Sequence, residues 1–316
     1  MPQPTRGEVH VDYILTNISV AFMQQQSAFI APQVFPVVPV DRATNRYFVF
    51  DQNPWFRDEM QRRPPNTESA GSGYTMSTDS YSCDVFALHK DIPDQVRANS
   101  DVPLNPDRNA TEWLTQMALL RMEIQWQTDY FRTTVWATDV TPSALWDNYS
   151  TSDPIADIRT GVRTILVNTG FRPNRLVLGY DVWLKLQDHP DVVDRMKITD
   201  DRVVTPQLLG RIVDVDQVIV CQAVKATNNE GGTAAYAFVH GKNALLAYAA
   251  PNPALEVPSA GYTFMWTGVS AGMGANVAVS NFRMEHLKSD RLEIEAAWDN
   301  KVVSNALGYF FNGAVS

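Results

Sequence analysis

The stretch Asn109–Ala137 (NATEWLTQMALLRMEIQWQTDYFRTTVWA) decides the fold, because it contains neither glycine nor proline and its apolar residues recur with helical spacing. One row of such residues is Trp113, Met117, Leu120, Ile124, Phe131 and Val135. A second row widens the apolar sector and comprises Ala118, Met122, Trp126 and Tyr130. A helix of about 27 residues would be roughly 40 Å long. We therefore predict a long scaffold helix that packs on more than one side.

Two start signals precede this helix. Asn109 with Glu112 three residues later is typical of a capping box. Asn105 followed by Pro106 offers an alternative start. The sequence alone leaves the choice between them open.

The composition indicates a globular protein. The 316 residues are 45% hydrophobic and 19% charged, and this length suggests about two domains. The net charge of -9 disfavours nonspecific nucleic-acid binding. No signal-peptide pattern occurs and no apolar run approaches roughly 18 residues, so we expect no membrane span and synthesis in the cytoplasm. Cys83 and Cys221 fit small buried side chains rather than a metal set or a disulfide framework.

The N-terminal region is predicted to form a helix within residues 1–31, followed by an extended arm. Residues 31–40 (APQVFPVVPV) contain three prolines, which exclude a helix and a central strand. An extended apolar arm cannot bury itself. We therefore expect its side chains to contact another copy of the chain, through Phe35, Pro36 and Val37.

A long hairpin is predicted after the arm. Residues 46–50 (RYFVF) and the run 74–90 favour strands, and the polar residues 51–73 between them form a tip of about twenty residues. An isolated two-stranded ribbon is marginally stable in water, so a neighbouring subunit should complete it.

The hairpin tip carries a charge cluster in an acidic chain. Three arginines fall within seven residues, and the cluster is Arg57, Asp58, Glu59, Arg62 and Arg63. A solvated loop would account for them, but we favour pairing with complementary charges on a neighbour, which would fix its register.

The middle of the chain predicts an α/β domain from roughly 150 to 250. Asp153-Pro154 starts a helix that runs to about Asn168 and ends at Thr169-Gly170. Further helices are expected from Gly179-Tyr180 and over 205–210, where Gly210 closes the second. The predicted strands are 175–178, 216–221 and a pair formed by 234–239 and 244–249, and a turn-rich loop spans 225–233.

The C-terminal part predicts strands. Residues 262–266 favour one strand, and 291–298 alternate strictly between apolar and charged positions. Asp299-Asn300 is expected to form a turn, and a last apolar run covers 306–315.

Catalytic and metal-binding patterns are weak. Gly268–Gly272 matches GxSxG with Ser270 at its centre, but no helix follows, and the only downstream histidine is His286 beside Glu285. The five histidines are scattered without metal-ligand spacing. We therefore expect no catalytic residue, cofactor or metal.

The order of these elements resembles the tailed-bacteriophage major capsid proteins of the Hong Kong 97-type fold. The resemblance covers nearly the whole chain and rests on order and spacing: FPVVPV (35–40), RYFVF (46–50) with a charged tip, YSCDVFALHKDIPDQVRAN (81–99), the long helix, and LLG (208–210) before an apolar strand.

The resemblance implies an α+β capsid fold with named parts. Residues 1–45 would form the N-arm and 46–90 the extended E-loop. Residues 91–150, with the long spine helix, and 255–316 would form the P-domain. Residues 151–254 would form the α/β A-domain, which meets its copies around hexamer and pentamer axes. The candidate axial tip is the loop 225–233, with Asn228, Asn229 and Glu230.

The resemblance also implies a function. The chain would self-assemble into hexamers and pentamers and form an icosahedral virion shell around packaged double-stranded DNA. It would enclose that DNA without sequence-specific binding, because a negatively charged wall would not hold the polymer. The expected partners are the chain itself, a portal, a separate scaffolding protein and, in some shells, a decoration protein.

Two departures from the family pattern matter. Some members crosslink through an E-loop lysine, whereas the first lysine here is Lys90, so we expect no such crosslink. Some members carry a long N-terminal scaffolding region, whereas this sequence begins near the arm, which is why a separate scaffolding protein is expected.

Two alternatives belong to other classes. An encapsulin-like cellular shell protein would enclose an enzyme cargo in a groove lined by the N-terminal helix, which the proline-rich arm does not favour. A soluble α/β hydrolase would use Ser270.

Overall fold

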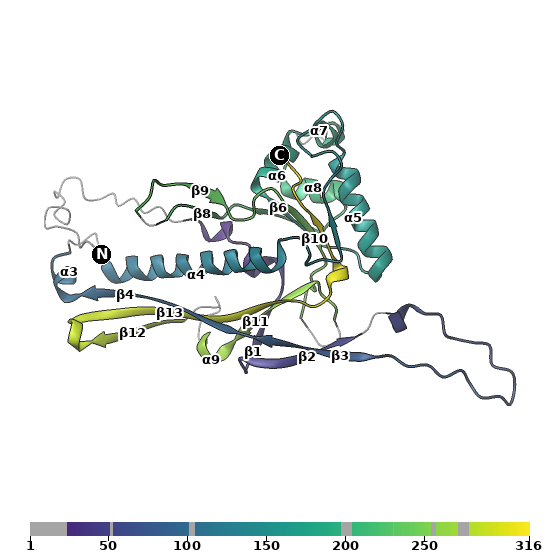
Figure 1. Cartoon of the computed structure of the whole chain (residues 1–316), viewed down its shortest axis with the longest axis horizontal. Coiled ribbons are helices and arrows are strands. Elements are labelled where there is room, and N and C mark those ends of the chain that lie inside the picture. The colour runs from purple at the N-terminus through teal and green to yellow at the C-terminus, as the bar shows by residue number, and fades with distance from the viewer. Residues whose placement is uncertain are drawn as a thin grey trace.

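The computed structural model describes residues 24–50, 53–100, 105–196, 204–229, 231–253, 257–270 and 278–316. A long helix lies along a sheet, an α/β part sits toward one end of that helix, and a two-stranded ribbon projects beyond it (Figure 1). The helix expected within residues 1–31 falls mostly on residues 1–23, which lie outside the described residues.

The long helix α4 spans Pro106–Tyr130 and is 25 residues long. The Asn105-Pro106 signal is the correct start, because the Asn105 side chain accepts hydrogen bonds from the backbone N–H groups of Asp107 and Arg108, each at 3.1 Å. The prediction of a helix start with a capping box at Asn109 is therefore wrong.

The end of α4 also differs from the expectation of Ala137. The helix stops at Tyr130, whose carbonyl accepts a hydrogen bond of 2.7 Å from the Trp136 indole. The chain turns back over the helix end, with Thr134 in the left-handed region at φ 68°. The apolar residues after Tyr130 belong to this turn rather than to another helical turn.

The buried face of α4 is the second of the two predicted rows. Met122, Trp126 and Tyr130 are at most 4% exposed, whereas Trp113 of the first row is 41% exposed. Leu120 and Ile124 of that first row pack at a separate small cluster beneath the α/β part. The helix thus packs on two sides, as predicted.

The sheet beneath α4 is organised around one long strand. Strand β13 (Ser289–Val302) pairs with three neighbours, and a fifth strand pairs with one of these. The other strands are β1 (Val37–Val40), β4 (Asp84–Pro93), β11 (Gly261–Trp266) and β12 (Ala278–Met284). The predicted alternation in β13 is confirmed, because Leu292, Ile294, Ala296 and Trp298 are all at most 5% exposed.

Two predictions for this sheet are wrong. Asp299 and Asn300 form no turn, because β13 continues through them and pairs them with Phe264 and Thr263 of β11. The run 74–90 is not one strand either. It divides at Cys83 into β3 (Met76–Ser82), which belongs to the ribbon, and β4, which joins β13.

The α/β part is built on a second sheet with the strand order β5-β14-β10-β6-β7. Strands β6 and β10 are almost wholly buried. The strands are β5 (Thr138–Val140), β6 (Arg175–Gly179), β7 (Gln217–Cys221), β10 (Ala244–Ala247) and β14 (Gly308–Phe311), and the helices are α5 (Pro154–Thr169), α6 (Tyr180–Gln187), α7 (Pro190–Met196) and α8 (Pro206–Val213).

Helix α5 confirms the sequence signals at both ends. Asp153 caps its start by accepting from the Ala156 N–H at 2.9 Å, and Gly170 ends it at φ 70°. Helix α8 runs past the predicted stop at Gly210 and ends at Asp214, which adopts a left-handed conformation.

The strand pairing in the α/β part differs from the prediction. Strand β9 (Tyr236–Phe238) pairs with β8 (Val224–Ala226) in a separate hairpin, while β10 pairs with β6 and β14. The C-terminal strand β14 therefore belongs to the α/β sheet, whereas the sequence-based division assigned it to the P-domain.

Candidate assembly surfaces

The ribbon is anchored at its base, and the ring of Phe56 lies against Gly170 at the end of α5, while the rest of the tip extends away from the core (Figure 1). Strands β2 (Thr44–Phe50) and β3 pair over seven residues. At the base, the ring of Tyr81 stacks on Phe264 with centroids 4.5 Å apart, and the Ser82 N–H donates to Asp299 at 2.8 Å. All described side chains of β3 except Tyr81 are exposed. The predicted hairpin is confirmed, and its outer part has little of its own chain to pack against.

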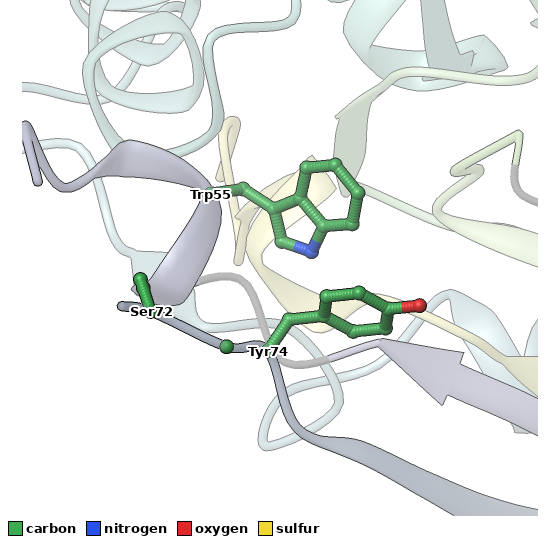
Figure 2. Close-up of a pocket in the computed structure, with 4 residues that line it drawn as sticks. Trp55, Ser72 and Tyr74 are labelled. Atoms are coloured by element: carbon green, nitrogen blue, oxygen red, sulfur yellow. The ribbon is translucent and has the colours of Figure 1, made fainter. Parts of the chain in front are cut away.

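The ribbon tip presents large apolar side chains to solvent. Trp55 is 64% exposed, Phe56 60% and Met60 95%. Trp55 comes from the short 3-10 helix η2 (Asn53–Phe56) and faces Tyr74, which precedes β3, with ring centroids 5.6 Å apart (Figure 2). Ser72 and Gly73 complete the walls of an open pocket between these rings. The sequence analysis missed this apolar patch, although NPWF within a polar loop was the available signal.

The five charged tip residues follow Phe56 along the chain. Arg57, Asp58, Glu59, Arg62 and Arg63 are all exposed. Arg63 donates to the Thr67 carbonyl, and none of the five forms an ion pair with another described residue. The charges therefore stay available to a neighbour, and their pairing across an interface remains a prediction.

The arm has partners within its own chain, so the premise that it lacks them is wrong. Phe35 is 1% exposed and packs on Tyr130 with ring centroids 4.7 Å apart. Ala31–Val34 form the short helix α2, so the prediction that the prolines exclude a helix from 31–40 is wrong: Pro32 lies near the helix start, where proline is tolerated. Arg175 binds the carbonyls at the end of α2. Val37 to Val40 form β1, which pairs in parallel with β11 at the sheet edge. We still predict contacts with another copy for Phe35, Pro36 and Val37, but this prediction no longer has the support of an arm that lacks partners in its own chain.

The predicted axial loop connects β8 and β9. Asn228 accepts a hydrogen bond from the Ala235 N–H at 3.2 Å, and Asn229 accepts one from the Gly232 N–H at 3.0 Å. Glu230 lies outside the described residues. The hairpin extends along α4, away from α7 (Figure 1). Its base packs on α4 through Ala223 and Val239.

A serine, a histidine and an aspartate come together at the start of the α/β part. Ser152 Oγ lies 3.0 Å from His189 Nε2, and His189 Nδ1 lies 3.7 Å from the Asp191 carboxylate. His189 Nδ1 accepts from the Asp191 N–H, so the proton sits on Nε2, and the Ser152 hydroxyl donates to the Asn148 carbonyl. Because a general base needs a free Nε2, this arrangement braces a loop and is not a catalytic triad.

The other chemical candidates find no support in the described residues. Ser270 ends a four-residue helix α9 (Thr267–Ser270), and the GxSxG residues after it lie outside the described ranges. Cys83 and Cys221 are free and buried, as predicted. No set of three metal-ligating side chains occurs within the described chain. None of the described helices is long and apolar enough to cross a membrane.

Curated relatives of this chain are phage proteins. The major capsid protein of Burkholderia phage BcepMu is 25% identical over 251 residues, which covers 75% of this chain and 76% of the relative. The major capsid protein of Pseudomonas phage JBD67 is 24% identical over 318 residues and covers 97% of each chain. No family model matches the sequence.

Solved structures share the fold over nearly the full length. A phage-related protein from Bordetella bronchiseptica RB50 has a TM-score of 0.70 at 24% identity and covers 92% of this chain and 94% of its own. The capsid of cyanophage P-SCSP1u has a TM-score of 0.66 at 9% identity and covers 98% and 94%.

A virus-like particle from Pyrococcus furiosus matches less closely, with a TM-score of 0.52 at 11% identity and coverage of 88% and 90%. The fold is therefore common to phage capsids and to this particle, while both curated relatives are phage major capsid proteins. The chain has the Hong Kong 97-type capsid fold and is a relative of the major capsid proteins of tailed phages.

Proposed function

We propose that this chain is the structural subunit of a phage shell, assembling with copies of itself into hexamers and pentamers. The observation that carries the proposal is the ribbon tip, where Trp55, Phe56 and Met60 stand exposed beside unpaired charges. An exposed apolar patch with a polar rim is typical of a protein–protein contact. Interfaces of obligate assemblies bury roughly 2,000–5,000 Å², and a ribbon supplies such area with few residues.

The proposed shell encloses double-stranded DNA without binding any particular sequence of it. The net charge of -9 supports this role, because a negative wall repels phosphate and lets the polymer slide. The role is structural and uses no cofactor. The other proposed partners are a portal, a separate scaffolding protein and, in some shells, a decoration protein. The proposal of these partners is based on the resemblance to the capsid family.

The proposed shell has no covalent crosslink through an E-loop lysine. Residues 1–89 contain no lysine, so the ribbon offers no side-chain amine for an isopeptide bond. The assembled particle should release single chains when boiled in SDS. A ladder of multimers on that gel would contradict this part of the proposal.

The assembly test is a charge reversal at the tip. Arg62→Glu places a negative charge where we propose a contact with an acidic surface of the next copy, and like charges opposed at an interface cost several kcal/mol. We expect electron microscopy and light scattering to show closed particles for the wild-type chain, expressed with its genomic neighbours, and unassembled chains for the variant.

The matched control is Arg132→Glu, which reverses an exposed charge beyond the end of α4. It should assemble as the wild type does. Closed particles from Arg62→Glu at unchanged yield would overturn the proposed tip contact. A wild-type chain that remains a compact monomer at every concentration and with every partner would overturn the shell function itself.

A further inference from the structure

The arm segment 24–35 lies across the joint between α4 and the α/β part. The Gln24 side-chain amide forms two hydrogen bonds with the backbone of Val224. It donates to the Val224 carbonyl at 2.7 Å and accepts from the Val224 N–H at 2.9 Å. Phe29 is 2% exposed and packs among Ala223, Val239 and α4. One short segment therefore contacts both bodies at once.

Beneath this segment, α4 contributes a carboxylate that no solvent reaches. Glu123 is 0% exposed, and its Oε2 accepts from the N–H groups of Ile30 and Ala31 at 2.9 and 2.8 Å. Its Oε1 has no hydrogen-bond partner in the described chain and lies 3.4 Å from Nε2 of His240. His240, just after β9, is 2% exposed. The carboxylate thus contacts the arm on one side and the α/β part on the other.

Few other polar or ionisable groups approach this pair. His240 packs between the rings of Trp126 and Phe131, with centroids 5.4 and 5.2 Å away. From β7, the buried Cys221 thiol senses the charge of Glu123, and from β8, Lys225 acts on His240. Neither His240 ring nitrogen, nor the Trp126 indole nitrogen, has a hydrogen-bond partner within the described ranges.

We propose that the Glu123–His240 pair is an acid-sensitive latch for the arm segment 24–35. While the pair carries one ionisable proton, the segment stays bound across the joint, and when the pair gains a second proton the segment is released. With one proton, the pair has no net charge and Glu123 can donate to His240 Nε2. A second proton puts a positive charge on a buried imidazole whose neighbour is then a neutral acid. The neutral acid no longer compensates that charge, and no other described group around the ring accepts the N–H, so the charged imidazole is favoured only in water. This inference concerns the single chain and goes beyond the proposed function.

The pKa values give the direction and the pH range. Burial raises the pKa of Glu123 to about 7, against two opposing backbone hydrogen bonds, and burial, aided by Lys225, lowers the pKa of His240 to about 3. The ordinary values are 4.5 and 6.5. Between pH 4.5 and 6.5 the held pair keeps its proton on Glu123 and the released pair keeps one on His240, so release neither binds nor loses a proton.

Below pH 4.5 the balance changes, because the released pair binds two protons and the held pair binds one until about pH 3. Because the pKa of His240 is lowered when the arm segment is bound, the bound state of segment 24–35 becomes less stable relative to the released state as the pH falls. Each pH unit favours release about tenfold, or about 30-fold between pH 4.5 and 3. Above pH 6.5 the raised pKa of Glu123 makes holding weaker as the pH rises, but only about threefold before Glu123 also ionises near pH 7.

The test measures amide hydrogen exchange in a peptide covering residues 24–35 of the full-length chain. Rates are corrected for intrinsic exchange at each pH from 7.5 to 3, a peptide from β10 reports global unfolding, and light scattering reports the assembly state. Wild-type protection should be flat from about pH 6.5 down to about pH 4.5 and then fall about 30-fold by pH 3. His240→Gln should stay protected to pH 3, and His89→Gln, at an exposed histidine of β4, should behave as the wild type does.

A second variant separates the two members of the pair. Glu123→Gln can still accept from both arm amides, but it no longer ionises in the released state. The onset of release should therefore rise from about pH 4.5 to near the ordinary histidine value of 6.5. A wild-type profile that stays flat to pH 3 would overturn the latch without any variant. Equal acid losses in wild type and His240→Gln would do so too, as would an unchanged onset in Glu123→Gln.

Discussion

The α/β part and the ribbon obtain their stability from opposite sources. In the α/β part, β10 is buried along its whole length and has a hydrogen-bonded strand on each side. In the ribbon, β2 and β3 form a sheet of only two strands, and Met60 at the tip is 95% exposed. Burial of apolar area stabilises a fold by about 25 cal/mol per Å². The α/β part can therefore fold on internal contacts, whereas the outer ribbon must gain its ordering energy from other molecules.

The largest effect on the stability of the single chain is expected in the core of the α/β part. Phe310 of β14 is 0% exposed and packs edge-on against Phe131 with centroids 5.4 Å apart. Phe310→Ala should lower the free energy of unfolding by about 3–5 kcal/mol, measured by urea denaturation of the unassembled chain. The control is Phe282→Ala, whose side chain on β12 is 42% exposed, with an expected loss below about 1 kcal/mol. Equal losses would mean that the core is not where the chain stores its stability.

A smaller effect is expected at the start of α5. Asp153 accepts from the Ala156 N–H at 2.9 Å, which satisfies one of the unpaired donors of the first turn. Asp153→Ala should cost about 1 kcal/mol in the same denaturation experiment. Asp153→Asn keeps an acceptor at that position and should retain most of the stability. A cost for asparagine as large as that for alanine would show that the charge matters and the cap does not.

The smallest effect on the single chain is expected at the ribbon tip. Arg62 is exposed and pairs with no described residue, so Arg62→Glu should change the free energy of unfolding by less than about 0.5 kcal/mol. The same substitution should abolish assembly. A loss of stability comparable to that of Phe310→Ala would show that the ribbon contributes to the fold of the single chain, and the contrast between the two regions would fail.

Local signals predicted the elements that depend on local chemistry. The limits of α5 follow from Asp153, Pro154 and Gly170, and the buried face of β13 follows from its alternation. The end of α4 did not follow, because Phe131 and Val135 continue the helical spacing of apolar residues, while in the structure Trp136 donates a hydrogen bond to the Tyr130 carbonyl. That contact forms only after the chain has turned back, so no helix-stop residue marks it.

Pairing between distant segments could not be predicted from the sequence. Residues 234–239 and 244–249 have the spacing of a hairpin, yet β10 finds its partners in β6 and β14. The prolines of the arm do exclude a central strand, but a sheet edge accepts them, and β11 offers that edge.

The role of Glu123 was not predicted, although its position on the apolar face of the helix was visible in the sequence. Glu123 comes three residues before Trp126 and seven before Tyr130, which places a carboxyl on the apolar face of the helix. A charged residue at such a position requires buried partners. What no spacing indicated was that the partners are two backbone amides of the arm and a histidine that follows more than a hundred residues later.

The division of the run 74–90 at Cys83 has a mechanical consequence. Because a single residue separates β3 from β4, the ribbon is joined to the ten-residue pairing of β4 with β13 without an intervening loop. A change of backbone angle near Cys83 would swing the distant tip through a wide arc, at the cost of the stacking of Tyr81 on Phe264 and the hydrogen bond from Ser82 to Asp299. In the shell proposed above, this hinge would let copies of the chain meet at the different tilts of five-membered and six-membered rings.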